Sequence, residues 1–142
     1  MYTVNDVFQR LRRVSRLCFE SRSLAGSKMD WNCCGNGETL TGFADGVLTF
    51  SDRFRLDNGR ICRDEKQWRQ EEGGLAFYHY REQRFQRIFL FRETENGLLA
   101  EQPYACMPDD YFGSLTVCGG AVVLTIRIVG SRKNELIRYE YR

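Results

Sequence analysis

The side chains with the clearest chemical potential stand together on a connection that contains Pro103 and Pro108. Asp109 and Asp110 come directly before Tyr111 on this connection. A desolvated carboxylate beside a phenol could move protons on a small molecule during hydrolysis or isomerisation. Adjacent aspartates also serve as turn and cap residues. Both interpretations of Asp109 stay open.

Other reactive residue types are scattered along the chain. The single histidine, His79, stands between two tyrosines in a strand-like run, and we interpret it as a residue of the wall or the surface. The six cysteines form no C-x-x-C pair and none lies near His79, so we expect no metal site and no cofactor. The sequence contains neither a glycine-rich phosphate loop nor a G-x-S-x-G elbow.

Charge and composition limit the partners that we expect. The 142 residues carry 21 basic and 19 acidic side chains, a net charge of +2, and the pI is about 8.2. Nucleic-acid binders are more basic, so we expect no nucleic-acid partner. No apolar run is long enough for a membrane span, and the first residues do not resemble a secretion signal. We therefore expect a cytoplasmic protein with no membrane association and with reduced thiols.

The elements that must position these residues are mostly strands. Residues 1–13 show helical spacing of apolar side chains, with Asn5 or Asp6 as the cap. The rest of the chain alternates short apolar runs with turn dipeptides. These dipeptides are Asn36-Gly37, Asn58-Gly59, Gly73-Gly74, Asn96-Gly97 and Gly119-Gly120. Strands are expected at residues 15–24, 39–50, 54–56, 61–69, 75–81, 87–92, 98–102, 114–118, 121–129 and 135–141.

So many consecutive hairpins in one chain favour a closed β-barrel. We expect one domain over residues 1–142: a mostly β, single up-and-down antiparallel β-barrel of 8–10 strands with a short N-terminal helix. Alternation on the last two strands gives one apolar and one polar face. The runs around Phe77 and Phe89 are aromatic on both faces, which predicts a helix or loop over the outside or a homodimer contact.

Three stretches together resemble an uncharacterised bacterial family of small calycin-like, or lipocalin-like, β-barrel domains. They are residues 75–78 with 84–88, the segment from Cys106 to Gly113 with Cys-x-x-Asp-x-Tyr-x-Gly spacing, and the turn Gly130-Ser131-Arg132-Lys133-Asn134. The resemblance covers residues 39–142 and implies the fold. The family has no established activity to carry over. Gln86 and Tyr104 stand where the family often has histidine, so no metal or general-base role transfers to them.

These observations favour a binding module that is not an enzyme, with a small, mostly apolar or amphipathic ligand inside the barrel. We expect Trp68, Tyr78 and Tyr139 to form the apolar lining, and Arg87, Asp109, Tyr111 and Arg132 to make polar contacts near a mouth. An interior filled by side chains is an equally open interpretation. Two alternatives remain: an enzyme that uses Asp109 and Tyr111 with Cys106, and a homo-oligomeric module that associates through the aromatic runs near Phe77 and Phe89.

Overall fold

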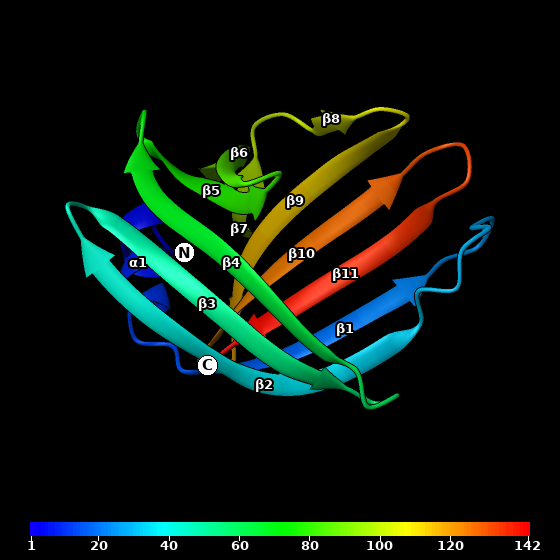
Figure 1. Cartoon of the computed structure of the whole chain (residues 1–142). Helices are drawn as coiled ribbons and strands as arrows, with labels where there is room; N and C mark the ends of the chain where they lie inside the picture. Colours follow the sequence, from blue (N-terminus) through cyan, green and yellow to red (C-terminus); the bar gives the residue numbers. More distant parts are fainter.

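A computed structural model describes all 142 residues and contains one helix and eleven strands (Figure 1). The elements in chain order are α1 (Val4–Leu11), β1 (Arg16–Ser23), β2 (Cys33–Ala44), β3 (Val47–Leu56), β4 (Ile61–Glu71), β5 (Gly74–Arg81), β6 (Arg84–Thr94), β7 (Gly97–Ala100), β8 (Tyr104–Cys106), β9 (Asp109–Cys118), β10 (Ala121–Val129) and β11 (Asn134–Tyr141). The expected fold class, mostly β with a short N-terminal helix, is confirmed.

The strands form one closed antiparallel wall. Neighbours run in the order β1 to β7, then β9, β10 and β11, and β11 pairs with β1 to complete the circle. Ten strands make the barrel, because β8 pairs with β9 alone and lies outside the closed order. Closure leaves no long free edge, which is the physical reason that a chain of consecutive hairpins adopts this form.

Helix α1 closes one end of the barrel. The Thr3 side chain accepts from the Asp6 backbone N–H and the Asp6 carboxylate accepts from the Thr3 backbone N–H, a reciprocal cap that starts the helix at Val4. Thr3, and not Asn5 or Asp6, is therefore the N-cap. The apolar stripe of the helix is buried against the barrel interior; its members are Val4, Val7, Phe8 and Leu11.

The half of the interior nearest α1 is filled by side chains. Phe50, Trp68 and Phe77 are fully buried, and their rings contact one another at centroid separations of 5.9 Å for Phe50 to Trp68 and 4.8 Å for Trp68 to Phe77. Phe89 continues the same cluster from β6. Packing of this kind leaves no room for a ligand in the half of the barrel interior next to α1.

Two predictions about β2 are wrong: one missed the turn at its end, and the other placed a turn inside the strand. Residues 39–50 do not form one strand, because Asp45 and Gly46 take positive φ values of 53° and 76° and turn the chain from β2 into β3. Asn36-Gly37, in contrast, is no turn: it lies inside β2, where Gly37 pairs with Phe54. A Cβ on Gly37 would meet the Arg53 carbonyl oxygen at 1.9 Å, so this glycine allows a close approach of two strands.

The expectation for the aromatic middle of the chain also needs correction. Phe77 and Phe89 point into the barrel core and are 1% and 2% exposed, so neither ring is available for a sheet-face contact. Helix α1 plugs the barrel end and does not cover the outer surface of these strands. Tyr80 is exposed on the outside and packs edge-on against the Phe85 ring.

The single helix is too short and too polar to pass through a lipid bilayer.

Candidate functional site

A cavity of about 500 Å³ opens at the end of the barrel opposite α1. Its lining comes from β1, β2, β3, β4, β5 and β11 and from the two connections that precede β2 and β4. The lining residues are Phe19, Ser21, Asp30, Trp31, Asn32, Cys33, Phe54, Leu56, Asn58, Arg60, Cys62, Arg63, Asp64, His79, Ile137 and Tyr139. This volume lies within the range of small-molecule sites, which is roughly 300–1,000 Å³.

The cavity walls are aromatic because alternate residues of three strands face inward. Phe19 of β1 stacks on Phe54 of β3 with ring centroids 4.7 Å apart, and it meets the edge of Tyr139 of β11 at 5.2 Å. Trp31 adds an indole from the connection between β1 and β2. Offset and edge-on rings of this kind offer flat apolar surfaces to a planar guest.

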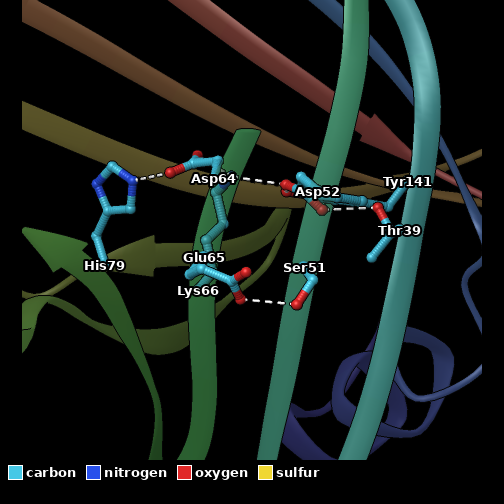
Figure 2. A network of polar contacts seen from close by, with 8 residues as sticks. All are labelled: Thr39, Ser51, Asp52, Asp64, Glu65, Lys66, His79 and Tyr141. Atoms are coloured by element: carbon cyan, nitrogen blue, oxygen red, sulfur yellow. Dashed lines mark hydrogen bonds and ion pairs between the residues drawn. The ribbon is translucent and has the colours of Figure 1, made fainter. Parts of the chain in front are cut away.

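A buried charged network lies beneath the cavity (Figure 2). The Lys66 ammonium is 1% exposed and donates to two carboxylates, Asp52 at 2.7 Å and Asp64 at 2.5 Å. Asp52 also accepts from the Thr39 hydroxyl and from the Tyr141 hydroxyl, each at 2.7 Å. Burying a charge is costly unless it is paired and hydrogen-bonded, and every charge here has such partners.

His79 connects this network to the cavity. Its Nε2 atom lies in hydrogen-bond contact with the second oxygen of Asp64, while its ring is partly exposed and stacks on Phe77 below. Because Asp64 accepts from Lys66 and from His79, both of its oxygens are occupied. In Figure 2 the other ring nitrogen of His79 points away from Asp64, and no protein group bonds to it.

The environment determines the charge states of the network. Burial alone would raise the pKa of Asp64, but the Lys66 ammonium and the His79 hydrogen bond outweigh it and hold that pKa well below its usual range. Burial would lower the pKa of Lys66, yet the two aspartates that accept from its ammonium raise that pKa well above its ordinary value. Burial raises the pKa of Tyr139 to about 12. At neutral pH the network therefore contains ionised Asp64 and Lys66 and a neutral phenol.

The connection between β1 and β2 is tied down at the cavity rim. The buried Glu135 carboxylate accepts from the hydroxyls of Ser23 and Ser27 and from the Asn134 backbone N–H. The Trp31 backbone N–H donates to the Ser23 hydroxyl at 2.9 Å. These bonds hold the indole at the entrance without any regular secondary structure.

A second polar cluster lies across the mouth. Lys133 forms an ion pair with the buried Asp109 at 3.0 Å, and its ammonium lies 5.1 Å from the centre of the Trp31 ring. The Arg81 guanidinium lies 5.9 Å from the centre of the Tyr111 ring, and burial raises the pKa of that tyrosine. Asp109 is thus neither an exposed turn residue nor a free carboxylate.

The residues expected at the site lie in four different places. Tyr139 lines the cavity, while Trp68 lies below it in the filled core with its indole N–H unpartnered. Tyr78 and Arg87 face each other on β5 and β6, outside the barrel, where they bind Glu71 and Glu72. Asp109 and Tyr111 lie across the mouth, and Arg132 is exposed in the turn before β11. Neither Trp68 nor Tyr78 lines the cavity as predicted: Trp68 faces inward but lies deeper than the cavity, and Tyr78 faces outward.

Sequence reasoning missed Asp52, Asp64 and Lys66, although a signal was present. Asp64, Lys66 and Trp68 alternate along β4 and so share one face of the strand. Asp52 has the same relation to Phe50 and Phe54 on β3. Charged residues in register with large apolar neighbours indicate a buried ionic site. The placement of His79 as a plain wall residue likewise needs correction, since it belongs to this network.

The fold and the cavity define a closed antiparallel barrel with one ligand-sized opening. No protein-family model matches the chain, and no curated protein matches it in sequence. Among solved structures, a redesigned beta barrel, mFAP0, bound to DFHBI is similar, with a TM-score of 0.50 and 9% identity over 94% of this chain and 100% of that chain. The redesigned barrel mFAP1 bound to DFHBI gives 0.45 and 12% over 94% and 96% of the two chains. A fluorescence-activating beta barrel designed de novo gives 0.44 and 11% over 92% and 94%. At these identities the likeness concerns the fold alone.

Proposed function

We propose that this protein is a calycin-like binding module that holds a small, mostly apolar molecule in the cavity at the open end of its barrel. The observation that carries the proposal is the 500 Å³ cavity itself, walled by Phe19, Phe54 and Tyr139 and floored by a polar network. A largely apolar, preformed hollow with few polar groups is the usual form of a small-molecule site.

Protein groups engage the aspartates of both the cavity floor and the mouth. Asp64 is occupied by Lys66 and His79, and Asp109 is occupied by Lys133. A carboxyl group acts as a general acid or base when it is free to exchange a proton with its substrate. Asp109 is not free in this way, so the enzyme alternative based on Asp109 and Tyr111 gains no support from the geometry.

The similarity in fold to mFAP0, which is described as bound to DFHBI, is consistent with this proposal. The resemblance to the calycin-like family, drawn from the motifs near Cys106 and Gly130, supports the same class of protein.

A fluorescent probe and a blocked cavity test the proposal. N-phenyl-1-naphthylamine is a neutral aromatic probe that brightens in apolar surroundings. We expect saturable binding to the full chain and at least tenfold weaker binding to Cys62→Trp, which places an indole in the cavity. Cys118→Trp is the matched control, because Cys118 is exposed and lies outside the cavity. Absence of saturable binding, or equal binding to Cys62→Trp and the wild type, would contradict the proposal.

A further inference from the structure

The cavity floor carries a ring nitrogen that the fold itself does not use. His79 gives Nε2 to Asp64 and leaves Nδ1 without a protein partner at the base of the hollow. The ring cannot turn freely, because Asp64 holds one edge and Phe77 stacks below it. Since Asp64 is an acceptor, Nε2 carries a proton, and Nδ1 is the position left open to a ligand.

The charges around His79 determine what Nδ1 can offer a ligand. The network holds two carboxylates, Asp52 and Asp64, against one ammonium, Lys66. With a neutral imidazole the network has a net charge of −1, and with an imidazolium its net charge is zero. An anion placed at Nδ1 would further stabilise the imidazolium, because opposite charges within a few ångströms stabilise each other. Protonated Nδ1 then donates a charge-assisted hydrogen bond to that anion.

The remaining charged and titratable groups near His79 come from each element around it. They are Asp64 and Lys66 of β4, Asp52 of β3, Tyr139 of β11, Arg81 two residues along β5, and Asp30 and Arg60 at the rim. Tyr139 is neutral until about pH 12. Asp30 accepts from the Asn32 amide at 2.7 Å. Asp52 and Asp64 are already paired with Lys66.

The rim adds one cation that no carboxylate neutralises. Arg60 lines the cavity, is exposed, and forms no ion pair. Arg63 follows Cys62 on β4 and faces outward, because alternate residues of the strand point to opposite faces. Asp30 is the one acidic lining residue without an ion-pair partner. The Arg60 guanidinium above and the His79 imidazole below are therefore the groups that can meet an anionic part of a ligand.

From this arrangement we infer that the ligand is an aromatic or amphipathic acid whose anionic group bonds to His79 Nδ1. The inference rests on the proposed function and names the chemical class of its ligand. The aromatic walls bind the apolar body of the molecule, and the Arg60 guanidinium group draws the anion into the mouth.

Two probes that share an aromatic body but differ in charge test this inference. We would use 8-anilinonaphthalene-1-sulfonate, which is anionic, and N-phenyl-1-naphthylamine, which is neutral. Because the anion bonds to His79 Nδ1, we expect the affinity for the sulfonate to fall about tenfold when that donor is removed. The affinity for the neutral probe should stay within twofold. A hydrogen bond to a charged group is worth about 1.5 kcal/mol or more, and that energy corresponds to a factor of about ten.

Two variants separate the role of His79 from general effects. His79→Gln should weaken sulfonate binding about tenfold, with little effect on the neutral probe. Arg60 is exposed and lies outside the buried network, so Arg60→Gln tests the same selectivity in a chain whose core is unchanged. We expect this variant to bind the sulfonate about threefold more weakly. Circular dichroism and the melting temperature verify folding of both variants.

The outcomes distinguish this inference from the proposed function. If both probes bind and Cys62→Trp blocks them, but neither His79→Gln nor Arg60→Gln acts selectively on the sulfonate, the inference is wrong and the binding function stands. If neither probe binds, or Cys62→Trp leaves binding intact, both fail.

Discussion

Replacing Lys66 with methionine should destabilise the barrel strongly. The Lys66 side chain is 1% exposed, and its ammonium is the only cation that contacts Asp52. Lys66→Met keeps the length and apolar stem of the side chain but leaves Asp52 as a buried carboxylate with only the Thr39 and Tyr141 hydroxyls as donors. Breaking a buried ion pair on one side costs about 3–5 kcal/mol. For a chain of this length, that loss corresponds to a melting temperature lower by roughly 10–15 °C.

Urea unfolding at pH 7, followed by tryptophan fluorescence and by circular dichroism, measures this loss. The double variant Asp52→Asn/Lys66→Met removes one charge of each sign, so we expect it to recover at least about 1 kcal/mol relative to Lys66→Met alone. The deficit of Lys66→Met should also shrink at lower pH, because a proton neutralises the uncompensated carboxylate. A loss below about 1 kcal/mol for Lys66→Met would refute the reasoning, since it would mean that water reaches the aspartates.

Two further perturbations test the wall and the network. Gly37→Ala should cost about 2–3 kcal/mol, because its Cβ would lie 1.9 Å from the Arg53 carbonyl oxygen, whereas Gly42→Ala on the same strand meets nothing within 4 Å and should change stability by less than about 0.5 kcal/mol; equal unfolding free energies for the two variants would contradict the close strand contact. The lowered pKa of Asp64 means that the folded state binds fewer protons there than the unfolded state, so its contribution is complete at neutral pH and is lost as the pH falls below about 4. Asp64→Asn should therefore lose less unfolding free energy between pH 5 and pH 3 than the wild type. If the unfolding free energies of the two proteins fall with pH at the same slope, Asp64 is not the source of the acid sensitivity.

The hairpin turns explain how much of the fold was predictable from the sequence. Gly59, Gly73, Gly119 and Gly120 take positive φ values in turns between antiparallel strands, and Gly97 takes one at the first residue of β7, directly after a turn. Local chemistry determines such turns, because few residues other than glycine adopt these angles without strain. An up-and-down barrel follows from their number and regular spacing.

The errors have a different physical origin. Position 37 requires glycine because the backbone of β3 approaches it closely. The Asn36-Gly37 dipeptide gives no information about such a contact between strands. The turn at Asp45-Gly46 is hidden because apolar residues on both sides resemble one continuous run, although Asp-Gly is itself a hairpin signal. The turn at Glu82 and Gln83, with φ values of 54° and 67°, uses no glycine at all.

The candidate site was less predictable than the fold. Tyr139 followed from alternation on the last strand, but the network around Lys66 draws on β3, β4 and β11, and closure of the barrel is what brings β11 to the other two. His79 has no neighbour in sequence that would suggest its role; its partner Asp64 is fifteen residues away on the adjacent strand. Contacts across strands depend on register, which composition and spacing do not specify.

Because α1 fills one end of the barrel, the molecule has the form of a cup and not of a tube. Whatever occupies the hollow must arrive and depart by the same route, past Trp31 and the connection that Glu135 holds in place. The residence time of a ligand then depends on how readily the rim opens, while its affinity depends on the walls and the floor. Selection could therefore adjust the rate of exchange and the affinity on separate sets of residues.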